Sequence, residues 1–389
     1  MAICDDAEKT PHIYAPATVS LNYDRGDLGA RIKLQADTIV ADAVALWTNV
    51  GTATIAFGKG ADLPVDVTSS NYAAYFQNFS DGLNPVIYDT DGSITDLIFG
   101  VGAKNSMLGF AGSAYYNAPY CNYAEGQAVI NGFLAVSDTT LGVVTAHEMG
   151  HLIGMDHAQL NSNQGLAEAD YPLMYPIAYR SAVTLHEDDV AAVSALYPDV
   201  SLNDVYGQIS GTFVLADGVT PVRGANLWAT ETTTSKLYSI VSDYRTQYTG
   251  YFKLLLPAGT YNLRAEAIQP GFTGGASVGP YSETSTDPSF QPPLYVGDAP
   301  MAPVTLGGET ASSFSIAAGC AATLTFGIDG SGSVGGNCSV TTTTTTPTST
   351  TAASTTTTAA PTTTTLAPTT TTTSTTSTTT TSVPTTTTA

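Results

Sequence analysis

The chain has 389 residues, which is enough for two domains, and its hydrophobic fraction of 43% allows a substantial core. It carries 12 basic and 33 acidic residues, for a formal net charge of −21. A surface of this charge repels phosphate backbones and anionic lipid, so no nucleic-acid partner and no membrane-surface partner is expected. No stretch approaches the roughly 18 consecutive apolar residues of a membrane-spanning helix, so the sequence predicts no span.

The first part of the chain mixes the patterns of helices and strands. Strands are predicted for ATVSLNYD, ATIAFG, PVIYD and AVINGFLAV, which are short and rich in apolar residues. Helices are predicted over 31–47, 139–150 and 188–197, the last one ending before a proline. In the first helix, one apolar face is expected at helical spacing: Ile32, Ala36, Ile39, Ala43 and Trp47.

From about Val205 the helical spacing disappears, and Gly, Thr and Tyr become more frequent. VYGQISGTFV, GANLWAT and KLYSIVS are predicted strands. YFKLLLPAGTYNLRAEA alternates on both sides of a Pro-Ala-Gly-Thr turn, which predicts a β-hairpin. The pattern indicates a β-sandwich of about seven strands that reaches roughly residue 328.

Residues 341–389 consist almost only of Thr, Ser, Pro and Ala. This composition cannot offset the entropy of ordering, so we expect a disordered stalk or linker, either O-glycosylated or unmodified. The first ten residues lack the basic and apolar regions of a signal peptide, so none is expected in this chain. The remaining sequence is nevertheless typical of an extracellular protein, secreted or tethered to the cell surface.

Four cysteines, at positions 4, 121, 320 and 338, form the even and sparse set that is typical of two disulfides in an exported protein. Cys320 and Cys338 flank a Gly-rich loop and are the favoured pair, which leaves Cys4 with Cys121 by elimination. Four free thiols are the alternative.

Three of the five histidines lie within TAHEMGHLIGMDHA: His147, His151 and His157. Residues four apart share a helical face, so His147 and His151 can bind one ion, and Gly154 allows the sharp turn that returns His157 to it. Glu148 lies a fraction of a helical turn away from the face of the two histidines, where its carboxylate can reach a water molecule bound to the ion. The pattern predicts one zinc ion with an open position, and Glu148 as general base and acid in peptide hydrolysis. The alternative is two surface histidines and a coincidental third.

The spacing H-E-x-x-H-x-x-G-x-x-H resembles the signature of the metzincin zinc endopeptidases, and PLMYP and LHEDDVAAVSALYP are similar to the Met-turn and closing helix of the matrixin branch. The resemblance covers about residues 15–200. It implies an α+β catalytic domain with a twisted mixed sheet, an active-site helix, a Met-turn centred on Met174 beneath the zinc ligands, and a C-terminal helix. It also implies that residues 176–186 wall the pocket for the side chain after the cut, with Tyr179 and Arg180 lining it.

Two features depart from that branch. His12 is the only histidine upstream of the motif, so a second zinc site cannot be built from histidines, and no cysteine-switch motif is present.

DTDGSITD places Asp89, Asp91 and Asp96 around a glycine, and these side chains could supply about half of the six to eight oxygens of a Ca²⁺ site. An Asp-Gly turn on an acidic surface is the alternative reading of this loop.

The second part of the chain resembles the carboxypeptidase regulatory-like (transthyretin-like) β-sandwich in VYGQISGTFV, VRGANLWAT and GYFKLLLPAGTYNLRAEA. The resemblance implies an accessory module that could bind an extracellular protein or a glycan. The predicted organisation is a matrixin-like zinc metalloprotease domain at 1–202, this β-sandwich at 203–340 and the stalk at 341–389.

The sequence as a whole indicates a monomeric, secreted zinc-dependent endopeptidase that acts on extracellular proteins or peptides. The alternative from another class is a surface adhesin or glycan- or protein-binding protein whose metzincin domain is a scaffold. Glu148 argues against it, because a scaffold has no use for that carboxylate. A zinc amidase acting on cell-wall peptide is a third reading, which the Met-turn makes less favourable.

Overall fold

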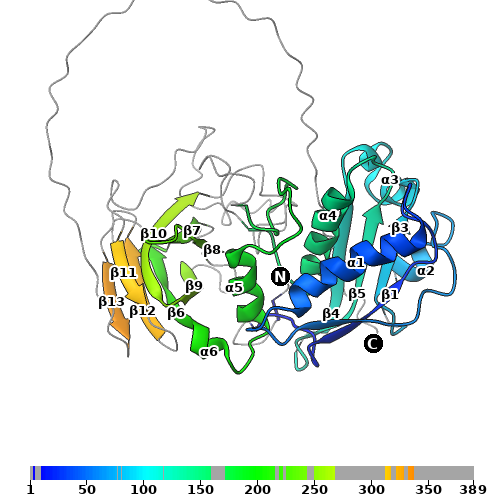
Figure 1. Ribbon diagram of the computed structural model, residues 1–389. Helices are drawn as coiled ribbons and strands as arrows, with labels where there is room; N and C mark the ends of the chain where they lie inside the picture. Colours follow the sequence, from blue (N-terminus) through cyan, green and yellow to red (C-terminus); the bar gives the residue numbers. More distant parts are fainter. Residues whose placement is uncertain are drawn as a thin grey trace, which may run out of the picture.

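The computed structural model of the chain contains two groups of strands with a helix between them (Figure 1). Cysteines 320 and 338 and the Thr-rich region lie outside the described residues, so the predictions made for them stay predictions. Within the described part of the chain, no helix is long and apolar enough to cross a bilayer. The described residues are 3–4, 10–76, 78–79, 81–116, 118–158, 171–214, 219–221, 225–242, 249–267, 312–316, 321–327 and 332–336.

The first group is a mixed five-stranded sheet with the strand order β2-β1-β3-β5-β4. The strands β2, β1, β3 and β5 run parallel, and β4 pairs antiparallel with β5 at the edge. An edge strand leaves one row of backbone groups without a partner in the sheet. The bounds are β1 (Thr18–Tyr23), β2 (Ala56–Lys59), β3 (Pro85–Asp89), β4 (Gly109–Tyr116) and β5 (Asn122–Asn131).

Both faces of this sheet are buried, because alternate residues of its central strands belong to different cores. In β3, Val86 and Tyr88 join the core under the long helices, whereas Ile87 joins the core on the other face. Parallel strands covered on both faces are expected to be apolar throughout rather than alternating. This accounts for PVIYD, in which all five residues are buried.

Two long helices, α1 (Lys33–Thr48) and α4 (Asp138–Leu152), pack together on one face of the sheet (Figure 1). The Trp47 Nε1–H donates to the Ala146 carbonyl at 2.8 Å and so joins the two helices. Ile32, which was predicted to lie on the buried face of α1, is 57% exposed, because it precedes the first helical residue as the N-cap. The shorter elements are α2 (Ala73–Phe76), α3 (Ser93–Phe99) and the 3-10 helix η1 (Ala103–Asn105).

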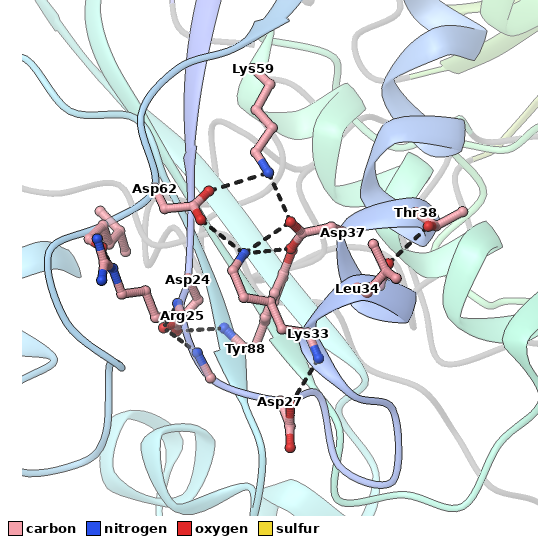
Figure 2. Close-up of polar contacts among 12 residues, drawn as sticks. Asp24, Arg25, Asp27, Lys33, Leu34, Asp37, Thr38, Lys59, Asp62 and Tyr88 are labelled. Carbon is pink, nitrogen blue, oxygen red and sulfur yellow. Dashed lines mark hydrogen bonds and ion pairs between the residues drawn. The ribbon is translucent and has the colours of Figure 1, made fainter.

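A network of ion pairs joins the start of α1 to β2 and the loop after it (Figure 2). Asp37 accepts hydrogen bonds from Lys33 Nζ at 2.8 Å and from Lys59 Nζ at 2.8 Å. The Tyr88 hydroxyl of β3 donates to the same carboxylate at 3.0 Å, and Asp62 pairs with both lysines. One carboxylate of α1 therefore contacts groups from two other segments of the domain, β2 and β3.

The segment before β1 is held by a disulfide between Cys4 and Cys121, as predicted. The same segment forms a parallel bridge between Ile13 and Asn122, at the start of β5. His12 is fully buried against the Tyr115 ring, and its Nε2 donates to the Tyr116 carbonyl at 3.2 Å. The N-terminal segment is thus fixed to the β4–β5 connection.

The second group of strands forms two four-stranded sheets, with the orders β11-β10-β7-β8 and β13-β12-β6-β9. Side chains from both sheets, such as Phe252 and Leu263, pack in one apolar cluster. The bounds are β6 (Tyr206–Val214), β7 (Ala225–Glu231), β8 (Leu237–Val241), β9 (Tyr251–Pro257), β10 (Gly259–Ala267), β11 (Ser312–Ile316), β12 (Ala321–Gly327) and β13 (Gly332–Gly336).

The predicted β-hairpin at 251–267 is wrong. Both strands exist, but β9 pairs with β6 and β10 pairs with β7 and β11, so the turn carries the chain from one sheet to the other. The alternation in this stretch has another cause: Phe252, Leu254 and Leu256 face the shared core from one sheet, and Tyr261 and Leu263 face it from the other.

Two strand assignments in the first domain also differ from the prediction. Strand β5 begins at Asn122 and ends at Asn131, so the second half of AVINGFLAV is not a strand. Strand β4, GFAGSAYY, was not predicted, because its Gly, Ala and Ser residues give no alternation of apolar and polar side chains.

Helix α5 (Glu187–Leu196) lies between the two groups of strands, and α6 (Leu202–Val205) follows it (Figure 1). Val193 and Leu196 of α5 belong to the core of the first group, whereas Ala191 belongs to the cluster of the second. The helix is therefore buried from both sides and connects the first group of strands with the second.

Candidate metal centre

Helix α4 carries the first two histidines of the motif. The Ser137 Oγ accepts from the Thr140 N–H at 3.0 Å and caps the helix, and Asp138 in the first turn is favourable for the helix dipole. Residues 141–152 are all buried, since α4 packs against α1, β4 and β5. The helix therefore holds His147 and His151 in a buried environment.

Gly154 makes the turn that returns the chain to the site. Its φ is +95°, and a Cβ at this position would lie 2.6 Å from the Tyr123 hydroxyl oxygen. Glycine is the residue that adopts such a φ without steric cost. The Met155 N–H donates to the Gly150 carbonyl at 2.9 Å, which closes the turn as expected from the sequence.

The three imidazoles converge as the spacing predicts. The His157 Nε2 lies 3.1 Å from the His147 Nε2 and 3.0 Å from the His151 Nε2. In a tetrahedral zinc site with Zn–N bonds of about 2.0–2.1 Å, two ligand nitrogens lie roughly 3.3 Å apart. Within the described residues, these three histidines are the only group of at least three His, Cys, Asp or Glu side chains placed to hold one metal ion.

The protonation pattern of the histidines fits a cation. His147 Nδ1 donates to the Leu173 carbonyl at 2.7 Å, and His151 Nδ1 donates to the Met155 carbonyl at 2.8 Å. Because Nδ1 carries the proton in both neutral rings, each Nε2 presents a lone pair to the common centre. Burial lowers the pKa of His147 to about 4 and that of His151 well below its ordinary value, which favours the neutral, ligating form.

The segment containing Leu173 and Met174 is held from α5. Asp189 accepts from the Leu173 N–H at 2.7 Å and from the Met174 N–H at 3.0 Å. It also accepts from the His186 N–H at 2.8 Å. The carboxylate thus fixes the backbone whose carbonyl orients His147.

Met174 is buried beneath the histidine helix. A Cβ at Gly150 would lie 2.3 Å from the Met174 sulfur and 2.9 Å from Trp47 Cζ2. The absence of a side chain at position 150 therefore allows the methionine to lie against the helix between His147 and His151. This position agrees with the apolar floor that the resemblance implies.

Glu148 is fully buried, and neither carboxylate oxygen has a hydrogen-bond partner among the described residues. Burial raises the pKa of the Glu148 carboxyl well above its ordinary value. An unpaired buried carboxylate is costly, and such a group is retained at sites where it has chemistry to perform. A cation on the adjacent histidines would supply compensating charge.

A narrow cavity of about 10 Å³, which is room for about one water molecule, adjoins His147 and Glu148. Its far wall is formed by Pro176, Ile177, Ala178 and Arg180. Arg180 lines this cavity, whereas Tyr179 does not: it stacks on Tyr175 and is 41% exposed. The ring turns away because three tyrosines of this segment pack on one another. That the cavity receives the side chain after the cut stays a prediction.

The loop considered for calcium uses its carboxylates for protein contacts. Asp89 is buried and accepts from the Ile94 N–H, the Thr95 N–H and the Thr95 hydroxyl. Asp91 accepts from the Ser93 N–H, and Asp96 accepts from two backbone N–H groups. These contacts agree with the alternative interpretation of a turn, so we do not propose calcium here.

Comparison with protein families gives one match for this chain. The family model described as matrixin matches residues 33–198. The match, together with the histidine geometry, supports a matrixin-like zinc metallopeptidase domain in this part of the chain. No curated protein matches the chain.

Among solved structures, the 5-hydroxyisourate hydrolase of Klebsiella pneumoniae is similar, at 18% sequence identity over 34% of this chain and 99% of that chain. The TM-score is 0.18, which is too low to carry an inference about the fold. The resemblance of residues 203–340 to the carboxypeptidase regulatory-like domain therefore stays a prediction.

Sequence reasoning missed two features of the centre. Asp189 was not predicted to belong to the centre, but it fixes the backbone at Leu173 and Met174. Gly109 of β4 was not singled out, although it lies directly against Glu148. Two adjacent aspartates in HEDD, shortly after LMYP, were the sequence signal that could have indicated a role for Asp189. Nothing in the sequence indicates a role for Gly109.

Proposed function

We propose that this protein is a zinc-dependent endopeptidase in which His147, His151 and His157 hold the metal and Glu148 is the general base. The observation that carries the proposal is the convergence of three Nε2 lone pairs beside a buried, unpaired carboxylate. Histidine ligands of this kind favour zinc. A zinc ion held there supplies a Lewis acid that acidifies water and polarises the carbonyl of the scissile peptide.

Glu148 carries out the proton transfers in this proposal. Its carboxylate accepts the proton of the attacking water and then delivers that proton to the departing amine. The burial that raises its pKa suits a group that must hold the proton between the two steps. Met174, Asp189 and the Leu173 and Met155 carbonyls, which accept from the two histidine rings, keep the ligands in place and do not touch substrate.

Strand β4 is the proposed binding edge for substrate. It is one of the two edge strands of the five-stranded sheet and runs past Glu148 at Gly109. An extended peptide can add to such an edge through backbone hydrogen bonds, which places a peptide bond beside the histidines without selecting its sequence. The narrow cavity next to His147 favours a small side chain after the cut.

We propose that the enzyme works outside the cell, as a monomer, on protein or peptide substrates. The Cys4–Cys121 disulfide supports an oxidising compartment. The division into 1–202, 203–340 and 341–389, and a glycan or protein ligand for the second region, are part of the same proposal.

Substitution of Glu148 by Gln tests this function. The variant keeps the three histidines and so should bind one zinc ion per chain, but the amide cannot accept the proton of water. We expect cleavage of an unfolded protein substrate to fall by about 10²–10⁴-fold or more. Zinc content by elemental analysis and cleavage by mass spectrometry are the two measurements.

His147→Ala is the companion variant, and it should lose both zinc and cleavage. Full activity of Glu148→Gln would remove the assigned role of the carboxylate. A wild-type protein that holds no stoichiometric metal would overturn the proposal as a whole.

A further inference from the structure

The second group of strands contacts the metallopeptidase domain through polar groups at the start of α5. The Ser239 N–H of β8 donates to Asp188 Oδ1 at 2.5 Å, and the Ser239 hydroxyl donates to Asp188 Oδ2 at 2.9 Å. The Leu237 N–H donates to the Glu187 carboxylate at 3.2 Å. Strand β8 is an edge strand of its sheet among the described residues, and α5 contacts the backbone groups on its outer side.

Beside these polar contacts, the apolar packing of α5 against the second group of strands is incomplete. A cavity of about 160 Å³ lies between α5 and the strands β8 and β9 and reaches as far as His157. Apolar packing across such a gap leaves the relative position of the two parts poorly determined. Both oxygens of Asp188, by contrast, are engaged by one residue, and the Asp188 side chain is 6% exposed.

Hydrogen bonds and short backbone links lead from this contact to a histidine of the metal centre. Asp188 is followed directly by Asp189, whose carboxylate accepts from the Leu173 N–H at 2.7 Å. The Leu173 carbonyl in turn accepts from His147 Nδ1 at 2.7 Å. The two aspartates lie in the first turn of one helix, so a displacement of Asp188 also moves the groups that hold Leu173.

We propose that Ser239, in the second group of strands, is a positioning residue of the metal centre, acting through Asp188 and the start of α5 on the Leu173 carbonyl that orients His147. This inference rests on the proposed zinc function and extends it. The second part of the chain thereby becomes a component of the catalytic unit rather than an independent accessory module.

The test uses the full chain with Ser239→Ala, which removes the hydroxyl donor and leaves the backbone N–H. Outer-shell partners of metal ligands commonly change metal affinity by about 10–100-fold, and Ser239 acts at one further remove, so we expect zinc affinity to fall by roughly 3–10-fold. The dissociation constant is measured by competition with a chromophoric chelator. We also expect kcat to fall while KM is unchanged, because Ser239 does not touch substrate.

Three further variants make the result specific. Ser239→Thr keeps the hydroxyl and should restore zinc affinity. Asp188→Asn should lower it to a similar extent, and the double variant Asp188→Asn with Ser239→Ala should be no worse than either single one. Ser210→Ala removes a half-buried serine from β6, in the other sheet of the second group of strands, and should leave zinc affinity unchanged.

The outcomes separate this inference from the function on which it rests. If the wild type binds zinc and cleaves substrate but Ser239→Ala matches it in both zinc affinity and kcat, the inference is wrong and the proposed function stands. The inference is equally wrong if Ser239→Ala lowers only the melting temperature. If the wild type binds no zinc, the proposed function itself is wrong.

Discussion

Gly109 lies where strand β4 passes the proposed general base. A Cβ at this position would be 2.9 Å from Glu148 Cγ and 3.1 Å from Val144 Cγ1. The carboxylate is thus positioned from one side by the backbone of β4. The absence of a side chain at 109 is what gives Glu148 its place beside the histidines.

Gly109→Val should therefore displace Glu148 without removing a metal ligand. We expect kcat to fall by about 10²-fold or more, the order of a general-base contribution, with zinc affinity close to that of the wild type. Steady-state kinetics and chelator competition are the measurements. Gly58→Val in β2 is the control, because a Cβ there meets nothing within 4 Å.

At the residue scale, the sequence predicts the metal ligands and the general base, but it does not predict the residues that fix their positions. His147, Glu148, His151 and His157 follow from one local spacing, since a helix and a turn fix their relation. Asp189 acts on Leu173, a residue 16 positions earlier in the chain, and this contact exists only once the chain has folded back.

Helix α1 is attached to the sheet by an acidic residue rather than by packing alone. Burial opposes ionisation of Asp37, but the hydrogen bonds from Lys33 and Lys59 outweigh burial and lower the pKa of Asp37 below its ordinary value. A carboxyl with a lowered folded-state pKa stabilises the fold above its unfolded pKa, and this contribution is lost as the pH falls through the folded pKa.

Asp37→Asn should cost about 1–2 kcal/mol in the free energy of unfolding at pH 7, since charge-assisted hydrogen bonds are replaced by weaker ones. The deficit should begin to shrink as the pH falls below about 4, the ordinary pKa of an aspartate, and should vanish once the pH is below the lowered pKa of the folded carboxyl. Urea unfolding at several pH values measures both effects. Asp42→Asn, at an exposed position of the same helix, should change little, and an equal loss in that variant would contradict the role given to the network.

Helices and strands were predicted well where the pattern of apolar residues was compatible with only one structure. The helix containing the histidines and the helix after the Met-turn were placed within two residues at each end. The pattern at 251–267 has two explanations, because strands of one hairpin and strands of two facing sheets bury alternate residues alike. Which strands pair depends on contacts far along the chain, as between β6 and β12.

At the scale of the whole molecule, α5 is the element that joins the two parts. It contributes Val193 to one core and Ala191 to the other, and its first turn presents Asp189 to the metal centre and Asp188 to β8. Sequence periodicity predicts the helix, yet it gives no reason for two adjacent aspartates to point to different partners. That arrangement depends on how the second group of strands lies against the first.

Asp188 makes the junction sensitive to pH. Burial raises the pKa of Asp188 from 3.8 to about 7, and the negative charges of Asp189 and Glu187 act in the same direction, whereas the hydrogen bonds from Ser239 oppose the shift. His186 lies at the helix start, and Asp156, His157, Tyr238 and Lys253 also line the cavity that Asp188 borders. A carboxyl whose folded-state pKa is raised contributes stability that is fully present below its unfolded pKa of 3.8 and is lost as the pH rises through about 7.

Relative to Asp188→Asn, which stays neutral, the wild type should therefore gain stability as the pH is lowered from 8 to 5. The expected gain is on the order of 2–3 kcal/mol, because one pKa unit corresponds to about 1.4 kcal/mol and roughly two units of the shift lie within this pH range. Groups common to both proteins cancel in the difference, so the free energy of unfolding of each is measured by urea titration at each pH. A difference that is independent of pH would show that Asp188 is ionised throughout, and a gain toward high pH would show that the bonds from Ser239 outweigh burial.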